Sequence, residues 1–235
     1  MRVEGSALKV VNKDGNILLA AVDEEDDERA EGRPEIDRKV LRDILLDSVD
    51  SSSILWGKKL LRVKSSPLNQ FTLNFADGDI HSNFDLVIGA DGAWSRVRSL
   101  VTSIIPFYSG ISGIETQITD IDTRYPLLSS RVGKGSYWVL GGGKTIMVQR
   151  NGDGSVRVYA MHRSPEDWAE KRGIDVAKRE VVVQMMLNFE FSGWSEDVKE
   201  LVRCGGELIE RQLWMMPIGV KWDSKLGCIL LSFFP

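Results

Sequence analysis

The sequence predicts a mixed α/β (α+β) protein in which two domains are interleaved along the chain. Three observations support this fold class. An apolar run, a glycine turn and a basic helical segment follow one another in residues 85–98. Short apolar segments separated by glycine turns occupy residues 113–161, which is typical of an antiparallel sheet. A last apolar segment at residues 226–233 indicates a strand that returns to the first domain.

The N-terminal part of the chain is predicted to form a hairpin and then a helix. Two apolar strands, at residues 8–11 and 17–22, flank a turn that contains Asp-Gly. The acidic run DEEDDERAE at residues 23–31 is expected to be a solvated loop. The segment EIDRKVLRDILLDSV then predicts a helix over residues 37–49, which Asp37 can cap. Its apolar stripe is expected to be buried and consists of Val40, Leu41, Ile44, Leu45 and Val49.

The stretch DLVIGADGAWSRVR at residues 85–98 follows further predicted strands at residues 54–63, 70–76 and 80–84. Gly89 and Gly92 supply backbone freedom, or allow close approach of another group, and Ser95 is a candidate N-cap of a short amphipathic helix. A strand, a glycine turn and a helix N-terminus together are a common way to bind a phosphate group. The alternative is an ordinary strand-to-helix turn, and the pattern alone does not decide between them.

Arg38 is the first candidate for a ligand contact. It falls in the opening turn of the predicted helix, where a cation opposes the helix dipole unless an anion lies nearby. That anion is either a ligand phosphate or carboxylate, or a protein carboxylate such as Glu35. The segment GGGKT at residues 141–145 lacks the first glycine of the phosphate-loop pattern, so a hairpin turn is the better interpretation.

Composition excludes several classes of function. The 235 residues are 43% hydrophobic with a formal net charge of -4, which gives no electrostatic case for nucleic acid. The apolar runs are too short to span a membrane, and the N-terminus lacks the order of a signal peptide, so we expect a cytoplasmic protein. Two cysteines cannot form a disulfide framework, and the two histidines have no metal-ligand spacing around them.

Two of these segments resemble motifs of a known family. RPEIDRKVLRDILL at residues 33–46 and DLVIGADGAWSRVR resemble, in this order, the R-x-x-L helix and the Asp-Gly motif of FAD-dependent monooxygenases of the aromatic hydroxylase group, particularly the tetracycline-destructase-like branch. The resemblance implies that residues 1–108 form part of a Rossmann-like FAD-binding domain. Residues 109–224 would then form an antiparallel or mixed-sheet substrate domain, and residues 225–235 would return to the FAD-binding domain.

The resemblance also implies roles for four residues. Arg38 matches an arginine that contacts the flavin, and Asp91 with Gly92 matches a pair near the FAD pyrophosphate that is also linked to NAD(P)H use. Gln117 falls where the related branch places a glutamine that faces the substrate. In such enzymes NAD(P)H reduces the FAD, and an oxygen atom from O2 passes to a small aromatic or hydrophobic substrate.

The sequence also departs from the family pattern. No G-x-G-x-x-G fingerprint is present, and no Gly-Asp motif follows LGCILLSFF, so we expect a chain truncated at both ends. The main hypothesis is an FAD-dependent monooxygenase that hydroxylates a small aromatic or polycyclic substrate with NAD(P)H and O2. The alternative is a non-catalytic truncated remnant that binds a small apolar ligand or a partner. A flavin-free nicotinamide dehydrogenase is less well supported, because it needs the same fingerprint.

Overall fold

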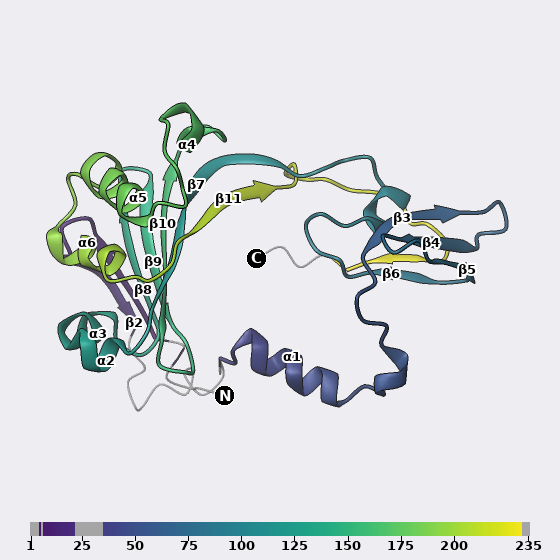
Figure 1. The fold of residues 1–235 in the computed structure, drawn as a ribbon, viewed down its shortest axis with the longest axis horizontal. Helices are drawn as coiled ribbons and strands as arrows, with labels where there is room; N and C mark the ends of the chain where they lie inside the picture. The colour runs from purple at the N-terminus through teal and green to yellow at the C-terminus, as the bar shows by residue number, and fades with distance from the viewer. Residues whose placement is uncertain (1–4, 6, 22–34, 232–235) are drawn as a thin grey trace. The chain divides into compact units, whose positions relative to one another are not determined.

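The computed structural model describes residues 5, 7–21 and 35–231, and the chain divides into two compact units. Unit 1 comprises Met1–Asp47 and Gly110–Leu213, and unit 2 comprises Ser48–Ser109 and Trp214–Pro235. Helices and strands are mixed in the chain, so the predicted α/β fold class is confirmed (Figure 1). The assignment of the predicted domains to FAD and to substrate stays a prediction.

Unit 1 is built on a seven-stranded mixed sheet with strand order β11-β7-β10-β9-β8-β1-β2. The strand β1 pairs in parallel with β8, while the pairs β1–β2, β8–β9, β9–β10 and β7–β10 are antiparallel. The strands, two of which continue into unit 2, are β1 (Leu8–Asn12), β2 (Ile17–Ala21), β7 (Phe107–Ile118), β8 (Ser136–Gly141), β9 (Lys144–Arg150), β10 (Val156–Arg163) and β11 (Ile209–Met215).

The β8–β9 turn shows how the sequence determines the register of this sheet. Gly141 pairs with Lys144, and the two turn residues, Gly142 and Gly143, have φ values of 58° and 71°. A two-residue hairpin turn that matches the strand twist requires positive φ at both positions, which glycine adopts without strain. The segment GGGKT is therefore a hairpin turn, as predicted.

Helices cover one face of the unit 1 sheet (Figure 1). Alternate residues of the strands point to this face, so Val156, Val158 and Ala160 of β10 pack into the core with Val198 and the other apolar residues of α6. The helices are α2 (Ile121–Arg124), α3 (Pro126–Val132), α4 (Trp168–Lys171), α5 (Arg179–Met185), the π-helix η5 (Met186–Glu190) and α6 (Glu196–Arg203).

The opposite face, called the second face here, carries the intervening residues of the same strands. Gln117 of β7 pairs with Arg157 of β10, and Glu115 of β7 pairs with Tyr159. These positions alternate with core residues such as Ile114 and Ile118, so their side chains point away from the helical layer. The second face therefore supplies the polar side chains of unit 1 that are relevant to binding.

The helix α1 (Arg38–Asp47) forms as predicted, but its apolar stripe is not buried. Val40, Leu41, Ile44 and Leu45 are 48%, 42%, 54% and 57% exposed. The 3.6-residue period identifies the apolar side of a helix, but it does not identify what covers that side. The expectation that the stripe is buried is thus wrong for the described residues, and the acidic run at 23–31 lies outside them.

Unit 2 contains two small sheets. The strands β3 (Leu60–Ser65), β4 (Phe71–Phe75) and β5 (Ile80–Phe84) form an antiparallel sheet, and β6 (Val87–Gly89) pairs in parallel with β12 (Cys228–Leu230). The unit also contains the 3-10 helices η3 (Ser51–Ser53) and η4 (Val97–Leu100). The small core around Phe71 is made of Val63, Phe71, Val87 and Val97. The strand expected at residues 226–233 is present as β12, although residues 232–235 lie outside the described part.

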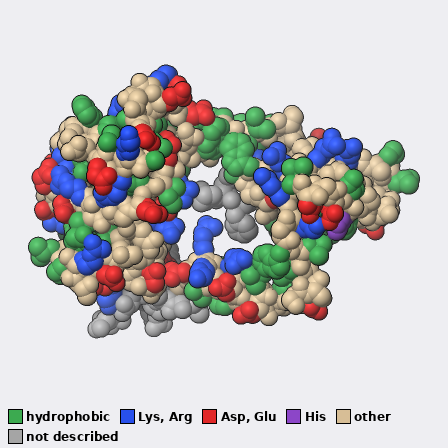
Figure 2. Space-filling model, viewed as in Figure 1, with side chains coloured by type: hydrophobic (Ala, Val, Ile, Leu, Met, Phe, Trp, Pro, Cys, Tyr) green, Lys and Arg blue, Asp and Glu red, His purple; other side chains and the backbone are tan. Residues whose placement is uncertain are grey.

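The surface of the molecule mixes apolar and charged side chains (Figure 2). Within the described ranges, no helix is long and apolar enough to cross a bilayer. The cytoplasmic location stays a prediction from the sequence.

Candidate functional site

The Asp-Gly loop after β6 is organised by the carboxylate of Asp91. One carboxylate oxygen accepts a hydrogen bond from the Ser95 hydroxyl at 2.5 Å, and the other accepts from the backbone N–H of Arg96 at 2.6 Å. The Ser95 Oγ accepts from the backbone N–H of Arg98 at 3.0 Å. Both side chains thus bond to backbone N–H groups at the start of η4, as capping residues do. The short amphipathic helix predicted from Ser95 is instead a 3-10 helix over Val97–Leu100.

These hydrogen bonds determine the charge state of Asp91. Partial burial raises the pKa of the carboxyl group, but the hydrogen bonds from Ser95 and from the backbone of Arg96 outweigh it and hold the pKa below its usual value. Asp91 is therefore ionised at neutral pH. The carboxylate oxygens of Asp91 already accept hydrogen bonds from Ser95, Arg96 and Val97. Asp91 therefore contributes to a ligand site by fixing the shape of the loop.

Arg98 holds the other side of the loop. Its side chain is 5% exposed, and its Nη2 donates to the carbonyl oxygen of Gly92 at 3.1 Å. A buried guanidinium makes such a bond because its donors cannot reach water. Asp91 and Arg98 together therefore set the backbone path of the four residues from Gly92 to Ser95.

The two glycines of the loop have different roles. A Cβ on Gly89 would lie 2.7 Å from Cβ of Val97 and 2.9 Å from Cδ1 of Leu230, so this glycine allows η4 and β12 to pack closely. Gly92 has a φ of 78°, and a Cβ there would meet nothing within 4 Å. Gly92 therefore allows the left-handed backbone conformation of the loop. It also leaves open space beside the backbone, where a ligand could approach.

Arg38 is the first residue of α1, and it is exposed. Its guanidinium forms no ion pair or hydrogen bond with any other residue for which the structure gives a position. A protein carboxylate partner such as Glu35, the alternative considered from the sequence, is thus not found among those residues. A cation at a helix N-terminus opposes the helix dipole, so the position of Arg38 favours the binding of a ligand anion.

Gln117 lies on the second face of unit 1. Its side-chain amide donates to Ser155 Oγ at 2.8 Å, and its backbone carbonyl accepts from Gly206 N–H at 2.9 Å. Gln117 also lines a pocket of about 390 Å³, which falls in the size range of small-ligand sites. The other residues that line the pocket come from β7, β10, α2 and the loop before β11, and include Glu115, Arg124, Arg157, Cys204 and Glu207.

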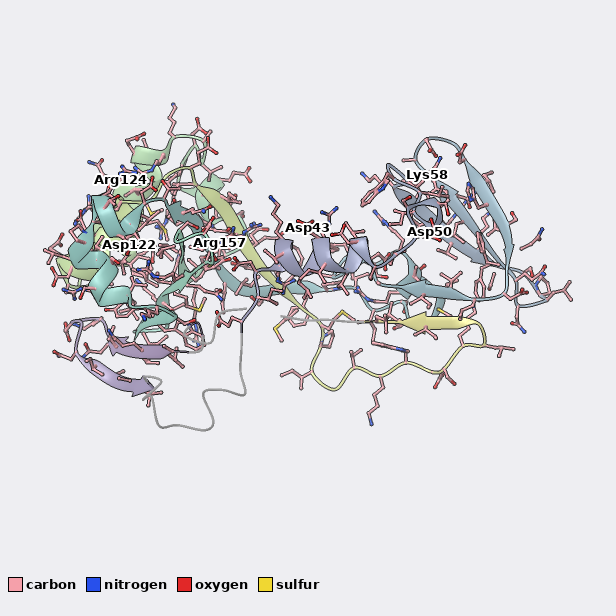
Figure 3. The ribbon with its side chains drawn as sticks, turned by 90° about the horizontal axis from the view of Figure 1, so that it is seen from below. Asp43, Asp50, Lys58, Asp122, Arg124 and Arg157 are labelled. Atoms are coloured by element: carbon pink, nitrogen blue, oxygen red, sulfur yellow. The ribbon has the colours of Figure 1, made fainter. Side chains whose placement is uncertain are left out.

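Sequence reasoning missed the charged residues of this pocket. Glu115 is 5% exposed and contacts Arg157 Nη1, of a second lining residue, at 3.3 Å. It also contacts Nε of Arg211, a residue outside the pocket lining, at 2.5 Å. Arg124 and Arg157, two of the lining cations, are labelled in Figure 3. The residues Glu115, Arg157 and Arg211 belong to three different strands and have no local motif. The only signal in the sequence was charge at positions that alternate with apolar residues, such as Arg157 between Val156 and Val158.

The four residues predicted as a site fall into the two units. Asp91 and Gly92 share the loop of unit 2. Arg38 and Gln117 belong to unit 1, Arg38 at the start of α1 and Gln117 on the second face of the sheet. Their roles toward FAD and substrate stay predictions.

The fold defines the class of protein. The FAD and uric acid complex of HpxO from Klebsiella pneumoniae matches with a TM-score of 0.73 at 20% identity, over 97% of this chain and 56% of that one. Tetracycline destructase Tet(51) matches with a TM-score of 0.58 at 18% identity, over 98% of this chain and 57% of that one. No protein-family model matches the chain. The fold is thus that of FAD-dependent monooxygenases.

Curated relatives agree with this class. Monooxygenase penA of Penicillium thymicola is 28% identical over 89% of this chain and 56% of its own length. Monooxygenase asqM of Emericella nidulans is 27% identical over 79% of this chain and 52% of its own length. A chloroplastic zeaxanthin epoxidase of an Oncidium hybrid cultivar is 29% identical over 73% of this chain and 24% of its own length.

The chain is therefore a relative of the FAD-dependent monooxygenases, which confirms the resemblance seen in its two motifs. It spans about half the length of the first two curated relatives. These relatives are named as enzymes, so the comparisons do not favour a non-catalytic remnant.

Proposed function

We propose that this chain is part of an FAD-dependent monooxygenase that uses NAD(P)H and O2 to oxidise a small aromatic or hydrophobic molecule. The observation that carries the proposal is the unpaired guanidinium of Arg38 at the N-terminus of α1, among the residues the structure describes. A diphosphate is the kind of anion that suits such a position, and FAD contains one. The solved relatives that bind FAD support the same cofactor.

The residues present are compatible with FAD in a second respect. The Asp91 loop leaves open space at Gly92, and its carboxylate is ionised and bonded within the loop. Bound FAD would supply the redox chemistry, while the protein binds, orients and excludes water. Arg38 would bind phosphate oxygens, the Gly92 backbone would allow close approach, and Gln117 would contact the substrate from the second face.

The test is flavin retention by the purified chain. The chain is incubated with FAD, passed through gel filtration and examined by visible absorption. We expect a flavin band that is lost in Arg38→Gln and kept in Arg42→Gln, a matched change one turn further along α1. Oxygen-dependent NAD(P)H oxidation is then measured on the loaded chain. A wild-type chain without the band, or an Arg38→Gln variant that keeps it, would contradict the proposal.

A further inference from the structure

The loop between β9 and β10, residues 151–155, contacts both the start of α1 and the side chain of Gln117. All three parts belong to unit 1. The loop is a tight turn, in which the Gly154 N–H donates to the Asn151 carbonyl at 3.1 Å and the Asn151 N–H donates to the Ser155 carbonyl at 2.8 Å. These backbone hydrogen bonds fix the shape of the loop, so a group bonded to it is held at a defined position relative to the sheet.

Asp37 attaches α1 to this loop. Its two carboxylate oxygens accept the backbone N–H of Gly152 at 2.9 and 3.2 Å. Its carbonyl oxygen accepts the backbone N–H of Leu41 at 3.0 Å, so Asp37 is also the residue at which the helical hydrogen bonds begin. Arg38 is the next residue. The contact with Gly152 therefore fixes the backbone from which the Arg38 side chain extends.

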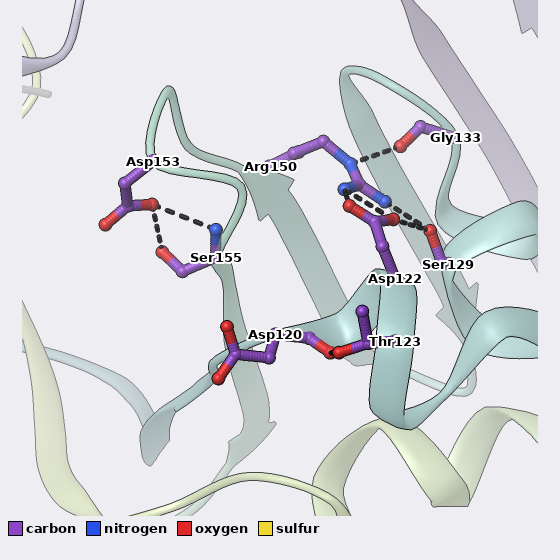
Figure 4. Close-up of polar contacts among 8 residues, drawn as sticks. All are labelled: Asp120, Asp122, Thr123, Ser129, Gly133, Arg150, Asp153 and Ser155. Atoms are coloured by element: carbon purple, nitrogen blue, oxygen red, sulfur yellow. Dashed lines mark hydrogen bonds and ion pairs between the residues drawn. The ribbon is translucent and has the colours of Figure 1, made fainter.

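Ser155 attaches the other end of the loop to Gln117. Ser155 is 4% exposed, and its hydroxyl donates to Asp153 Oδ1 at 2.6 Å (Figure 4). The same oxygen accepts Nε2 of Gln117 at 2.8 Å and Nδ2 of Asn151 at 3.0 Å. A hydroxyl group has one donor and two acceptor positions, so these three contacts use all of them.

The direction of the Ser155 hydroxyl decides which end of the Gln117 amide faces it. Hydrogen bonds from the side chain and the backbone of Ser155 hold the pKa of the Asp153 carboxyl below its usual value. An ionised carboxylate only accepts hydrogen bonds, so the Ser155 proton stays on the side of Asp153. Ser155 Oγ can then only accept from Gln117, which holds Nε2 of the amide at the loop and leaves Oε1 for a ligand.

We propose that the loop of residues 151–155 positions two ligand contacts at once. It fixes the start of α1, and hence Arg38, through Asp37. It fixes the amide of Gln117 through Ser155. This inference rests on the proposed function, because it takes Arg38 as a contact of FAD and Gln117 as a contact of the substrate.

The first test compares two uncharged replacements of Asp37. Asp37→Asn keeps an oxygen where the Gly152 N–H is accepted, whereas the side chain of Asp37→Ser is one bond shorter and does not reach it. Asparagine and serine are both good N-cap residues, so the two variants differ in the contact with the loop. The dissociation constant of FAD is measured by flavin fluorescence. Asp37→Ser should weaken FAD binding by about five-fold, and Asp37→Asn should bind FAD at least as tightly as wild type.

Charge alone predicts a different result. Loss of a carboxylate beside a cation that binds phosphate strengthens the attraction of the cation for the phosphate, so both variants would bind FAD more tightly. Weaker binding in Asp37→Ser therefore reports the lost position of Arg38. Asp43→Asn removes an exposed carboxylate further along α1 and is the matched control, which should not weaken FAD binding. Equal FAD binding by Asp37→Ser and Asp37→Asn would overturn the positioning of Arg38 by the loop.

The second test uses NMR of the purified chain without flavin. The Nε2 protons of Gln117 should have chemical shifts unlike those of Gln184, an exposed glutamine on α5. Ser155→Ala should move the Gln117 signals to the positions of the Gln184 signals. Asp153→Asn should keep them in place, because its side-chain oxygen still accepts the Ser155 hydroxyl. Gln117 signals that do not move in Ser155→Ala would overturn the positioning of Gln117.

Hydrogen exchange of the Gly152 amide separates this inference from the proposed function. Exchange should be faster in Asp37→Ser than in Asp37→Asn, whether or not the chain retains FAD. If exchange and the Gln117 signals respond as expected in a chain that retains no FAD, the loop holds both side chains and the proposed function is removed. If FAD is retained and neither signal responds, the proposed function stands and the positioning role of the loop is overturned.

Discussion

Replacement of Arg150 by methionine is expected to destabilise the chain by about 2–3 kcal/mol. Arg150 lies at the end of β9, and its side chain is 13% exposed. Its Nε donates to the Gly133 carbonyl at 2.7 Å, its Nη2 donates to Ser129 Oγ at 2.8 Å, and its Nη1 contacts both carboxylate oxygens of Asp122 at 3.1 Å (Figure 4). One guanidinium thus connects α2, α3 and the turn after α3 to the sheet.

The magnitude follows from the exposure of each partner. The bonds to Gly133 and Ser129 come from a largely buried cation, and each contributes about 1 kcal/mol net. The Asp122 side chain is 62% exposed, so that ion pair adds at most about 1 kcal/mol. Methionine keeps the apolar stem and therefore limits the loss to the polar contacts. At about 2–4 °C per kcal/mol for a chain of this size, the melting temperature should fall by roughly 5–10 °C.

The assay is urea unfolding followed by far-UV circular dichroism and tryptophan fluorescence. Arg150→Lys should lie between wild type and Arg150→Met, because one ammonium keeps the charge but cannot reach three acceptors in different directions. Arg62→Met, an exposed arginine on a strand, controls for loss of charge. If Arg150→Met unfolds within about 0.5 kcal/mol of Arg62→Met, the network does not stabilise the fold and the reasoning is refuted.

Three further predictions concern packing and titration. Gly113→Ala would place a Cβ against the carbonyl oxygen of Ala160 in the next strand, so the yield of folded protein should fall sharply. Gly193→Ala is the control, because a Cβ there meets nothing within 4 Å, and this variant should fold normally. Equal yields of the two variants would contradict the prediction. Burial lowers the pKa of His162, so the folded ring is neutral while the unfolded ring has its usual pKa of 6.5. Stability in urea should therefore decrease as the pH falls below about 6.5, and a stability that stays flat from pH 7.5 to 5.5 would exclude this. Burial, with a smaller effect of Glu200, raises the pKa of the Cys204 thiol to about 11. In a variant with Cys228 replaced by serine, alkylation of Cys204 at pH 8 should therefore be roughly 100-fold slower than alkylation of an ordinary thiol. An ordinary rate would show that the thiol is not shielded.

Much of the sheet could be predicted because its strands alternate apolar and polar residues between glycine turns. The hairpin at Gly142 and Gly143 is an example, since the turn type requires those residues. The helices α2 and α3 were not predicted, because segments of four and seven residues are too short to show a helical period. The stripe of α1 was predicted, but its exposure was not, because burial depends on parts of a structure that are distant in sequence.

The candidate site shows the same division. The Asp91 loop could be predicted because its capping contacts lie within six residues of one another. The group formed by Glu115, Arg157 and Arg211 could not, because it depends on the register of three strands that are far apart in sequence. Arg38 lies between these cases: its position on the helix was predictable, but its lack of a partner among the described residues required the structure.

The parallel pairing of β6 with β12 affects the order in which the chain can fold. Val87 pairs with Cys228, although the whole segment Gly110–Leu213 of unit 1 lies between them. During synthesis β6 leaves the ribosome long before its partner exists, whereas β7 to β10 become available one after another and can pair at once. We therefore expect the sheet of unit 1 to form first. Until β12 is translated, the edge of β6 that pairs with it is open, and an open strand edge can pair with another chain.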